Sequence, residues 1–289
     1  MTAKVVRALG CSGRKACRWL GLNRSSLRYA PKPVVGRKRL LEEAIVAMSL
    51  KYPTEGYKKI AGQLRALGYK INKKQVQRVR RLEGLQVPPP QKRLRRQGLS
   101  TGLPQKAQHR NHVWAWDFVA DYTQRGGKLR VLTLIDEYTR ECHALYADRS
   151  LTAADVLQVL EKQIEQHGAP QYIRSDNGPE FIAKIIQNWL KDNGIKTIYI
   201  DPGCPWQNGY AESFNSRFRL ECLDREMIYT LSEGRVVFND WRHYYNHVRP
   251  HRSLCLLTPS AYARKLTDQS PGSVRPAGSS GQGFEVGNN

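Results

Sequence analysis

The spacing of apolar residues predicts two differently built parts of the chain. Over residues 57–67, apolar side chains recur every three or four positions, which predicts a helix that ends at a glycine. Asn72 then provides a cap for a second helix, with Val76 and Val79 on its inner side. Two helices joined by such a short turn are typical of a helix-turn-helix. An αα-hairpin that binds protein would give the same pattern.

Beyond residue 110 the apolar pattern changes to that of an α/β domain. We expect strands at 112–121, 129–135, 142–146, 171–174 and 196–200, and helices at 153–167, 179–193, 207–223 and 233–247. The order β-β-β-α-β-α-β-α predicts a mixed sheet, in which an antiparallel meander is followed by β/α units.

Changes in composition mark the boundaries between these parts. Residues 1–85 form a basic helical region with a second, shorter helix–turn–helix pattern at 14–30. Residues 86–109 contain three consecutive prolines followed by KRLRR, which predicts an extended basic linker. The α/β core is expected over 110–265, and the Gly-, Ser- and Pro-rich tail over 266–289 is expected to be disordered.

The positive charge is concentrated at one end of the chain. The first 100 residues hold 25 Lys and Arg against 4 Asp and Glu, whereas the remaining residues hold 22 and 21. Such a polycation favours nucleic acid as a partner, because Lys and Arg displace counterions from phosphates. The second helix of the predicted pair carries its basic residues largely outward, where they would contact DNA: Lys73, Lys74, Arg78, Arg80 and Arg81.

Several classes of protein do not fit the sequence. No apolar run approaches the roughly 20 residues of a membrane-spanning helix, and no secretory signal is visible at the N-terminus. The six cysteines form no CxxC pair and are interpreted as reduced thiols of a cytoplasmic protein. His243, His247 and His251 are spaced like ligands on one helix face, but Pro250 should break that helix, so a zinc site is not expected.

Three acidic residues stand at or near the ends of predicted elements. Asp117 lies within an apolar strand, Asp176 follows the fourth strand in RSDNGPEF, and Glu212 begins a helix in QNGYAESFNSRFR. A carboxylate in an apolar strand costs free energy unless a cation neutralises it, and no basic residue stands close by in sequence. Carboxylates without His or Cys favour Mg²⁺, with Mn²⁺ as a substitute, and three of them can hold two ions. The alternative is that these acids are helix caps or surface charges.

Arg219 follows Glu212 by seven residues, or two helical turns, so both side chains share one helix face. A cation at that position would contact DNA held at the carboxylates. Other acids compete for the same site. Asp121 is the nearest rival of Asp117, and Asp136 could support the metal ions from outside their direct ligands.

The motifs in their order resemble those of a known family. WDFVADYT, LTLIDEYTRE, RSDNGPEF, QNGYAESFNSRFR and YYNHVRPHRSL are similar to the second-reading-frame transposases of the bacterial "insertion sequence three" family. The resemblance implies a ribonuclease-H-like core of the retroviral-integrase superfamily. It also implies a DDE triad of Asp117, Asp176 and Glu212 that binds two Mg²⁺, with Arg219 as the basic helix residue. Localisation in the bacterial cytoplasm, associated with the nucleoid, would follow.

Two features depart from the family pattern. Cys204 and Trp206 stand where a basic and a small polar residue are expected, which could alter recognition of the DNA ends. The chain also begins without the segment that the first reading frame supplies. Because active enzymes of this family are commonly frameshifted fusions, we expect a fusion or partnership with the first-frame product.

The sequence therefore predicts a transposase that binds the terminal inverted repeats of its element and target DNA. It would cleave one strand to free a 3′-hydroxyl and direct that hydroxyl at another phosphodiester. Bringing two ends together implies a homo-oligomer on DNA. Three other hypotheses remain: a DNA-binding regulator with an inactive core, a structure-specific nuclease that cuts without joining, and a tyrosine or serine recombinase, which fits poorly.

Overall fold

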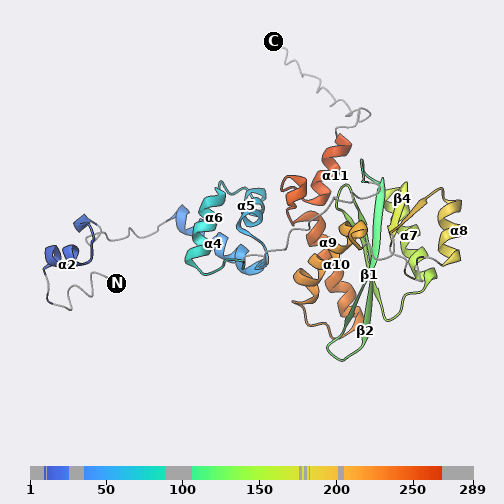
Figure 1. Cartoon of the computed structure of the whole chain (residues 1–289), viewed down its shortest axis with the longest axis horizontal. Coiled ribbons are helices and arrows are strands. Elements are labelled where there is room, and N and C mark those ends of the chain that lie inside the picture. Colours follow the sequence, from blue (N-terminus) through green and yellow to red (C-terminus); the bar gives the residue numbers. More distant parts are fainter. Residues whose placement is uncertain are drawn as a thin grey trace, which may run out of the picture.

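A small helical domain precedes an α/β core (Figure 1). The computed structural model of the chain describes residue 10 and residues 12–25, 36–88, 106–175, 178, 181, 183–200 and 205–268. Residues 89–105 of the predicted linker and 269–289 of the predicted tail lie outside these residues, so both stay predictions. Helix α2 (Gly13–Trp19) is the first half of the expected N-terminal pair, whose second half falls largely outside the described residues.

The helical domain consists of α4 (Arg37–Lys51), α5 (Tyr57–Ala66) and α6 (Lys73–Leu82). The three helices enclose a small apolar core made of Ile45, Ile60, Ala61, Leu64, Ile71, Val76 and Val79. The predicted pair α5–α6 is present, and the Asn72 side chain accepts a hydrogen bond from the Lys74 amide at 3.0 Å, as a cap should. Helix α4 was not predicted, because its apolar residues are spread around the helix and follow no single stripe.

Arg80 corrects the expectation that all basic residues of α6 face outward. Its side chain is only 3% exposed. The guanidinium donates to the carbonyl oxygens of Leu85, at 2.9 Å, and of Glu55. Arg80 follows Val76 by four residues and therefore lies on the inward face of the helix. It stabilises the fold of the domain rather than contributing to a DNA-binding surface.

The core is built on a five-stranded sheet in the order β3-β2-β1-β4-β5. Its strands are β1 (Val113–Tyr122), β2 (Lys128–Asp136), β3 (Cys142–Asp148), β4 (Tyr172–Ser175) and β5 (Lys196–Tyr199). The first three pair antiparallel, and β4 and β5 continue in parallel with β1. The predicted element order and mixed sheet are confirmed, with β1 as the central strand.

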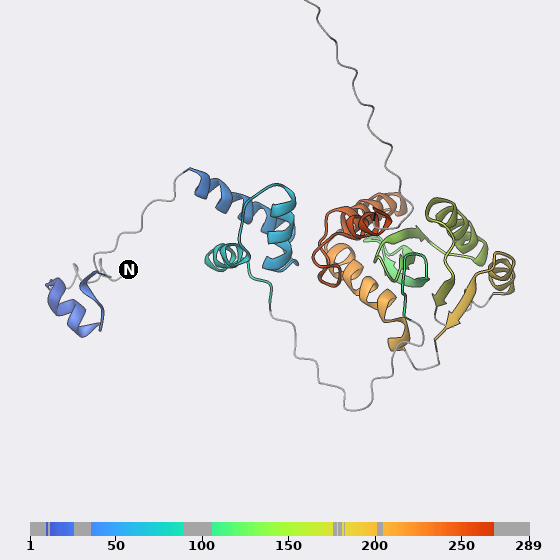
Figure 2. The ribbon, with the colours of Figure 1, turned by 90° about the horizontal axis from the view of Figure 1, so that it is seen from above.

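Helices cover both faces of the sheet (Figure 2). On one face, α7 (Ala153–His167) and α8 (Lys184–Asp192) pack over Trp114 and Trp116 of β1. On the other, α9 (Gly209–Phe218) and α10 (Leu231–His247) pack over Ala115 and Val119. Alternate residues of β1 thus reach opposite cores, which explains why its sequence is apolar almost throughout.

The predicted helix at 207–223 is divided into three short pieces. A 3₁₀ turn (Pro205–Asn208) leads into α9, and a π-helical turn (Arg219–Leu223) follows it. The predicted helix at 179–193 is described from Lys184 onward as α8. A further helix, α11 (Pro259–Asp268), was not predicted and includes the first three residues of the expected tail.

The helical domain contacts the core at α10. The rings of Tyr52 and Tyr244 stack with their centroids 4.8 Å apart, and the Tyr244 hydroxyl donates to Glu55 Oε1 at 2.7 Å. Gly62 of α5 faces Pro250 so closely that a Cβ there would lie 3.5 Å from Pro250 Cγ. In both ribbon views the domain lies beside the α9–α10 layer (Figures 1 and 2).

Candidate active site

Asp117 lies in the middle of the central strand with a half-buried side chain. Its Oδ1 accepts the Phe118 amide at 2.8 Å, and its Oδ2 accepts the side-chain amide of Asn215 at 2.8 Å. Its backbone carbonyl accepts the Thr133 hydroxyl of β2 at 3.1 Å. These bonds orient the carboxylate within the strand.

Glu212 lies in the first turn of α9 and is exposed. Asn215, which binds Asp117, follows Glu212 by three residues, so their Cβ atoms are about 5–6 Å apart on one helix face. The preceding Asn208 also approaches β1, with its side-chain amide 3.5 Å from the Trp116 carbonyl. The start of α9 is therefore attached to β1 on either side of Glu212, and the two predicted site residues Asp117 and Glu212 belong to adjoining elements.

Asp176 lies outside the described residues, so its place in the site stays a prediction. The strand that precedes it is described as far as Ser175. In the parallel pairing of β1 with β4, Val113 faces Tyr172 and Ala115 faces Arg174, a constant offset of 59 positions. The same offset separates Asp117 from Asp176 in the sequence.

A buried ion pair, which the sequence did not lead us to expect, supports the end of β4. Arg174 and Glu137 are both fully buried, and Arg174 Nε lies 2.7 Å from Glu137 Oε1. Burial raises the pKa of Glu137, and the facing guanidinium of Arg174 opposes that shift. The pair joins the loop after β2 to the strand that leads into Asp176. The sequence signalled this pair only through Arg174, two positions before Asp176, and Glu137, at the end of an apolar strand.

Asp136 does not support the metal site in the way that the sequence suggested. Its carboxylate accepts the backbone amides of Asn111, Tyr138 and Thr139 at 2.7–2.8 Å and so closes the turn between β2 and β3. It pairs in register with Trp114, three residues from Asp117, which is about 10 Å along the strand. Its role is to shape the turn.

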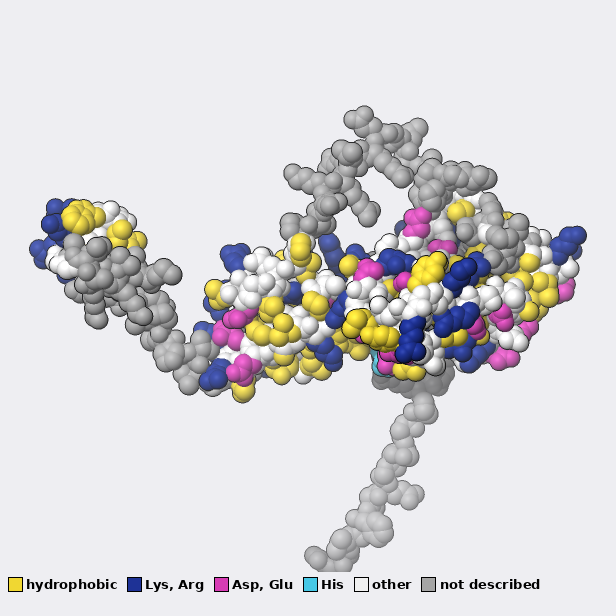
Figure 3. Space-filling view, turned by 90° about the horizontal axis from the view of Figure 1, so that it is seen from below, with side chains coloured by type: hydrophobic (Ala, Val, Ile, Leu, Met, Phe, Trp, Pro, Cys, Tyr) yellow, Lys and Arg dark blue, Asp and Glu magenta, His cyan; other side chains and the backbone are white. Residues whose placement is uncertain are grey.

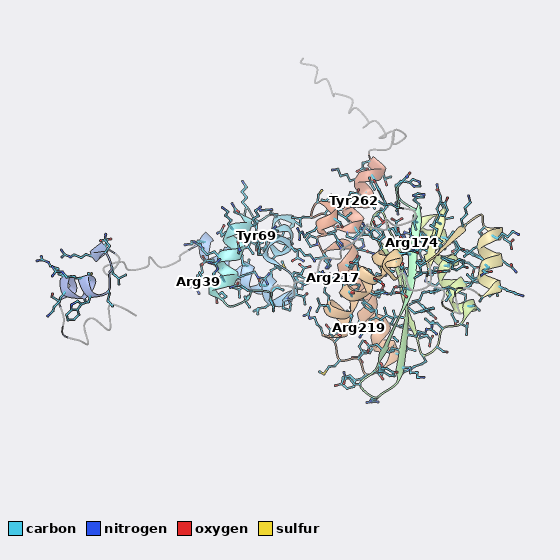
Figure 4. The ribbon with its side chains drawn as sticks, viewed as in Figure 1. Arg39, Tyr69, Arg174, Arg217, Arg219 and Tyr262 are labelled. Carbon is cyan, nitrogen blue, oxygen red and sulfur yellow. The ribbon has the colours of Figure 1, made fainter. Side chains whose placement is uncertain are left out.

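Arg219 lies at the end of α9, about half exposed (Figure 4). Its Nη2 donates to the Ala120 carbonyl at 2.9 Å, and its Nη1 lies 3.5 Å from Asp121 Oδ2. Asp121, the alternative candidate to Asp117 as a metal ligand, thus forms an ion pair with Arg219 near the C-terminal end of β1. The guanidinium is fixed against the backbone of β1, the strand that carries Asp117. Contact between Arg219 and DNA stays a prediction.

The four basic residues predicted to contact DNA from α6 are all exposed, namely Lys73, Lys74, Arg78 and Arg81. Arg78 lies 3.8 Å from Glu42 of α4, across the surface of the domain. Basic side chains lie on both the helical domain and the core on the face shown in Figure 3. DNA contact by these four residues stays a prediction.

The other candidate groups of the sequence do not form sites in the described residues. The His243 and His247 rings lie 4.6 Å apart on α10, but no cluster of three or more His, Cys, Asp or Glu suited to a metal occurs in the described part of the chain. Four cysteines are free thiols: Cys17, Cys142, Cys222 and Cys255. None of the described helices is both long and apolar enough to cross a membrane.

Family models match the two parts of the chain separately. Residues 107–205 and 193–259 each match a model described as an integrase core domain, and residues 36–93 match an HTH-like domain. The chain is 35% identical over 256 residues to an uncharacterized 31.7 kDa protein of insertion element IS407 from Burkholderia multivorans, covering 88% of this chain and 91% of that protein. It is 33% identical over 270 residues to an uncharacterized 39.2 kDa protein of IS476 from Xanthomonas euvesicatoria, covering 92% and 76%.

The chain also shows more distant similarities. A putative transposase, InsK of IS150 from Escherichia coli, is 28% identical over 72% of this chain and 76% of its own. The HTLV-2 integrase catalytic core solved with magnesium is 17% identical over 53% of this chain and 97% of that chain, with a TM-score of 0.40. A simian T-cell lymphotropic virus intasome is 16% identical over 83% and 80%, with a TM-score of 0.48. At this level the two structures support no inference about the site.

The ribonuclease-H-like order of the sheet and the matches to both halves of the integrase core define a DDE-type polynucleotidyl transferase. An HTH-like domain precedes the catalytic part, as expected for an enzyme that acts on DNA. Because two insertion-element proteins are at least 33% identical over most of both chains, the chain belongs to the insertion sequence three family of bacterial transposases, as a second-reading-frame product. Its general activity is DNA transposition.

Proposed function

We propose that Asp117, Asp176 and Glu212 bind two Mg²⁺ ions and catalyse strand cleavage and 3′-hydroxyl strand transfer at the ends of the element. One observation carries this proposal. The hydrogen bond from Asn215 to Asp117 attaches the helix of Glu212 directly to the strand of Asp117. Asp117 and Glu212, which are 95 residues apart in sequence, thereby come from elements that contact each other. The β1–β4 register, in which partners are 59 positions apart, supports Asp176 as the third carboxylate beside Asp117.

The donors in the described part of this site fit a hard divalent cation. Asp117 and Glu212 offer carboxylate oxygens, and the Asn215 Oδ1 atom is buried without a hydrogen-bond partner. Oxygen donors of this kind favour Mg²⁺, or Mn²⁺ in its place, over metals that prefer nitrogen or sulfur. When bound, such ions activate the attacking oxygen and stabilise the leaving oxygen of a phosphodiester.

The remaining residues of the site position these donors. Asn215 fixes the Asp117 carboxylate, and the Arg174–Glu137 pair fixes the end of β4. Arg219 binds the Ala120 carbonyl, three residues and about 10 Å along β1 from Asp117, and would neutralise a DNA phosphate at that distance from the carboxylates. The chain itself then needs no nucleophilic side chain, because water and the 3′-hydroxyl of DNA act in turn.

Specific binding of DNA is assigned to the helical domain. The exposed α6 residues Lys73, Lys74, Arg78 and Arg81 would enter the major groove of the terminal inverted repeats. Simultaneous binding of two ends and target DNA calls for a homo-oligomer, and the first-frame product is the expected fusion or partner. Measured with end-containing duplexes, Lys74→Gln/Arg81→Gln should weaken binding and lower its dependence on salt.

Strand transfer by the purified chain tests the proposal. A duplex that carries the element end is incubated with Mg²⁺ and a target plasmid, and the joined products are counted. The variants Asp117→Asn, Asp176→Asn and Glu212→Gln should each abolish joining while leaving the affinity for end DNA within about twofold. Cleavage without joining in the wild type would instead indicate a nuclease, and binding without either reaction would indicate a regulator. Normal joining by any one variant would remove that residue from the triad.

A further inference from the structure

A cavity of about 580 Å³ lies where the helical domain meets the core. Its walls come from α5, from α9 and from the segment after α10. Five cationic side chains line it: Lys59, Arg140, Arg217, Arg249 and Arg252. Among the described residues, no Asp or Glu lines it. Figure 4 shows Arg217 on the side of α9 that faces the helical domain.

Two of these five cations form ion pairs with acidic residues that do not line the cavity. Arg249 forms a two-pronged bond with Glu221, with donor–acceptor distances of 2.7 and 2.6 Å. Lys59 lies 3.7 Å from Glu55. Arg140, Arg217 and Arg252 have no carboxylate within ion-pair distance among the described residues. The cavity therefore carries an excess of positive charge.

The Arg140 guanidinium stacks on a tyrosine ring, and one of its nitrogen atoms has no hydrogen-bond partner. Its guanidinium lies 3.8 Å from the centre of the Tyr210 ring, a cation–π contact. Its Nη1 atom is buried and has no hydrogen-bond partner. Buried donors of this kind are nearly always paired in native proteins, with a protein group, ordered water or a bound ligand. A stacked arginine is also suited to a phosphate, which accepts two parallel N–H groups.

The neighbouring groups are also those of an anion site. The hydroxyl-bearing residues Tyr210, Ser213 and Ser253 line the cavity with the cations. Burial, together with the nearby Arg249, lowers the pKa of Lys59 to about 8. The same two causes lower the pKa of His251 to about 2, so that ring stays neutral at physiological pH. The charged form of Lys59 is thus disfavoured first by burial and next by Arg249, and an anion bound in the cavity would favour it.

We propose that this cavity binds phosphodiester groups of the DNA on which the enzyme acts, outside the metal site. The assignment to DNA rests on the proposed function, and it follows from the charge of the cavity and from its position between the HTH-like domain and the core. Tyr210, Ser213 and Arg217 share one face of α9, and Glu212 lies on a different face of that helix. A strand held here contacts both the helical domain, through Lys59, and α9. The volume lies in the range of ligand pockets and exceeds what one phosphate group needs.

The test compares two double variants of the full chain. Arg140→Gln/Arg252→Gln removes two cations of the cavity, and Arg264→Gln/Lys265→Gln removes two exposed cations of α11 as the matched control. Binding of a fluorescent end-containing duplex is measured over a range of salt concentrations. We expect the cavity variant to bind about tenfold more weakly and its salt slope to fall by roughly 1–2, about 0.9 per lost phosphate contact. Equal slopes for wild type and cavity variant, or equal losses in both variants, would overturn the proposal.

A second arm locates the phosphates and identifies their source. Duplexes carrying one neutral methylphosphonate at successive positions should weaken wild-type binding at one or two positions, and the cavity variant should not respond there. A melting temperature that rises with millimolar inorganic phosphate only in the wild type, without any methylphosphonate effect, would assign the cavity to a free anion instead. Glu212→Gln should keep the full DNA-binding behaviour. The proposal for the cavity can thus be wrong while strand transfer still depends on Glu212. Equally, the cavity can bind DNA while strand transfer does not depend on Glu212.

Discussion

The side-chain amide of Asn215 donates a 2.8 Å hydrogen bond to the carboxylate of Asp117, across 98 positions of sequence. It is a contact between a helix and the central strand, and it lies one helical turn from Glu212. We conclude that the relative position of two of the proposed metal-binding carboxylates depends on this amide. Asn215 is a positioning residue, since it acts on the carboxylate of Asp117 and not on the reacting DNA.

Asn215→Ala should therefore reduce strand transfer by protein that is still folded. The loss of one hydrogen bond to a charged group costs about 1.5–3 kcal/mol of folding free energy. Misplacement of a ligand by about 1 Å can cost about 100-fold in rate. We expect joining to fall by between 10- and 100-fold, with an unchanged affinity for end DNA.

The control is Asn193→Ala, because the Asn193 side chain donates only to the Trp189 carbonyl at the exposed end of α8. Joining and binding are measured on the same preparations, with the concentration of Mg²⁺ varied. A positioning role predicts that the Mg²⁺ requirement of Asn215→Ala shifts to higher concentration. If its Mg²⁺ dependence matched that of the wild type, the amide would not act through the Asp117 carboxylate.

The Arg174–Glu137 pair predicts a strong and non-additive effect on stability. Removing one member of a buried ion pair leaves an uncompensated charge, which costs about 3–5 kcal/mol. Arg174→Met should therefore lower the free energy of unfolding by that amount. Arg174→Met/Glu137→Leu should recover part of the loss, because neither charge of this pair is then left buried without the other. Urea denaturation of the two single variants and the double variant measures the coupling, and purely additive losses would contradict it.

The contrast between predicted and unpredicted elements has a physical explanation. The order of strands and helices along the chain, and most helix positions, followed from local apolar periodicity, which a linear sequence displays directly. Asp117 stood out because a charge within an apolar strand is costly. Helix α4 could not be found in this way, since Ile45 is its only buried apolar residue among those described and no apolar stripe marks its inward side.

The site was less accessible to prediction where residues from distant segments converge. Arg80 was misplaced because its charge was counted and its four-residue spacing from Val76 was not. Arg174 and Glu137 are unremarkable apart, and only the sheet brings them together. The cationic cavity is the extreme case. Lys59, Arg140 and Arg217 come from three separate elements, and no local pattern relates them.

The contact between the helical domain and the core predicts a role for Tyr244. Its hydroxyl donates to Glu55, whose other carboxylate oxygen is buried without a hydrogen-bond partner. Burial raises the pKa of Glu55, with Lys59 as the largest opposing influence. Tyr244→Phe removes the hydroxyl and should cost about 1.5–3 kcal/mol, the range for a bond to a charged group.

The loss of stability in Tyr244→Phe should be confined to the contact between the helical domain and the core. Hydrogen exchange should increase in α5 and at the end of α10 in Tyr244→Phe, while the sheet keeps its protection. Tyr229→Phe serves as the control, because that side chain is 46% exposed. Uniform changes across the whole chain would show that Tyr244 contributes to global stability and has no particular role in holding the domain against the core.

Lys59 predicts a pH dependence of stability whose sign can be worked out. Its pKa falls from 10.5 to about 8 in the folded chain, chiefly through burial. Four charged groups face it: Arg249 and Arg217, which lower the pKa, and Glu55 and Glu221, which raise it. Between pH 8 and 10.5 the unfolded chain holds a proton on this amine that the folded chain has released, so the free energy of unfolding rises with pH.

The experiment compares wild type with Lys59→Met by urea denaturation at pH 7.5, 8.5 and 9.5. Subtracting the variant cancels groups common to both, including the buried cysteines, whose raised pKa values act in the opposite direction above pH 9. At 1.36 kcal/mol per pH unit, the wild type should gain roughly 1–2 kcal/mol relative to the variant between pH 8 and 9.5. Lys59→Arg, which stays charged throughout, should show no such gain. If the difference between wild type and Lys59→Met stayed constant over this range, Lys59 would keep its ordinary pKa in the folded chain.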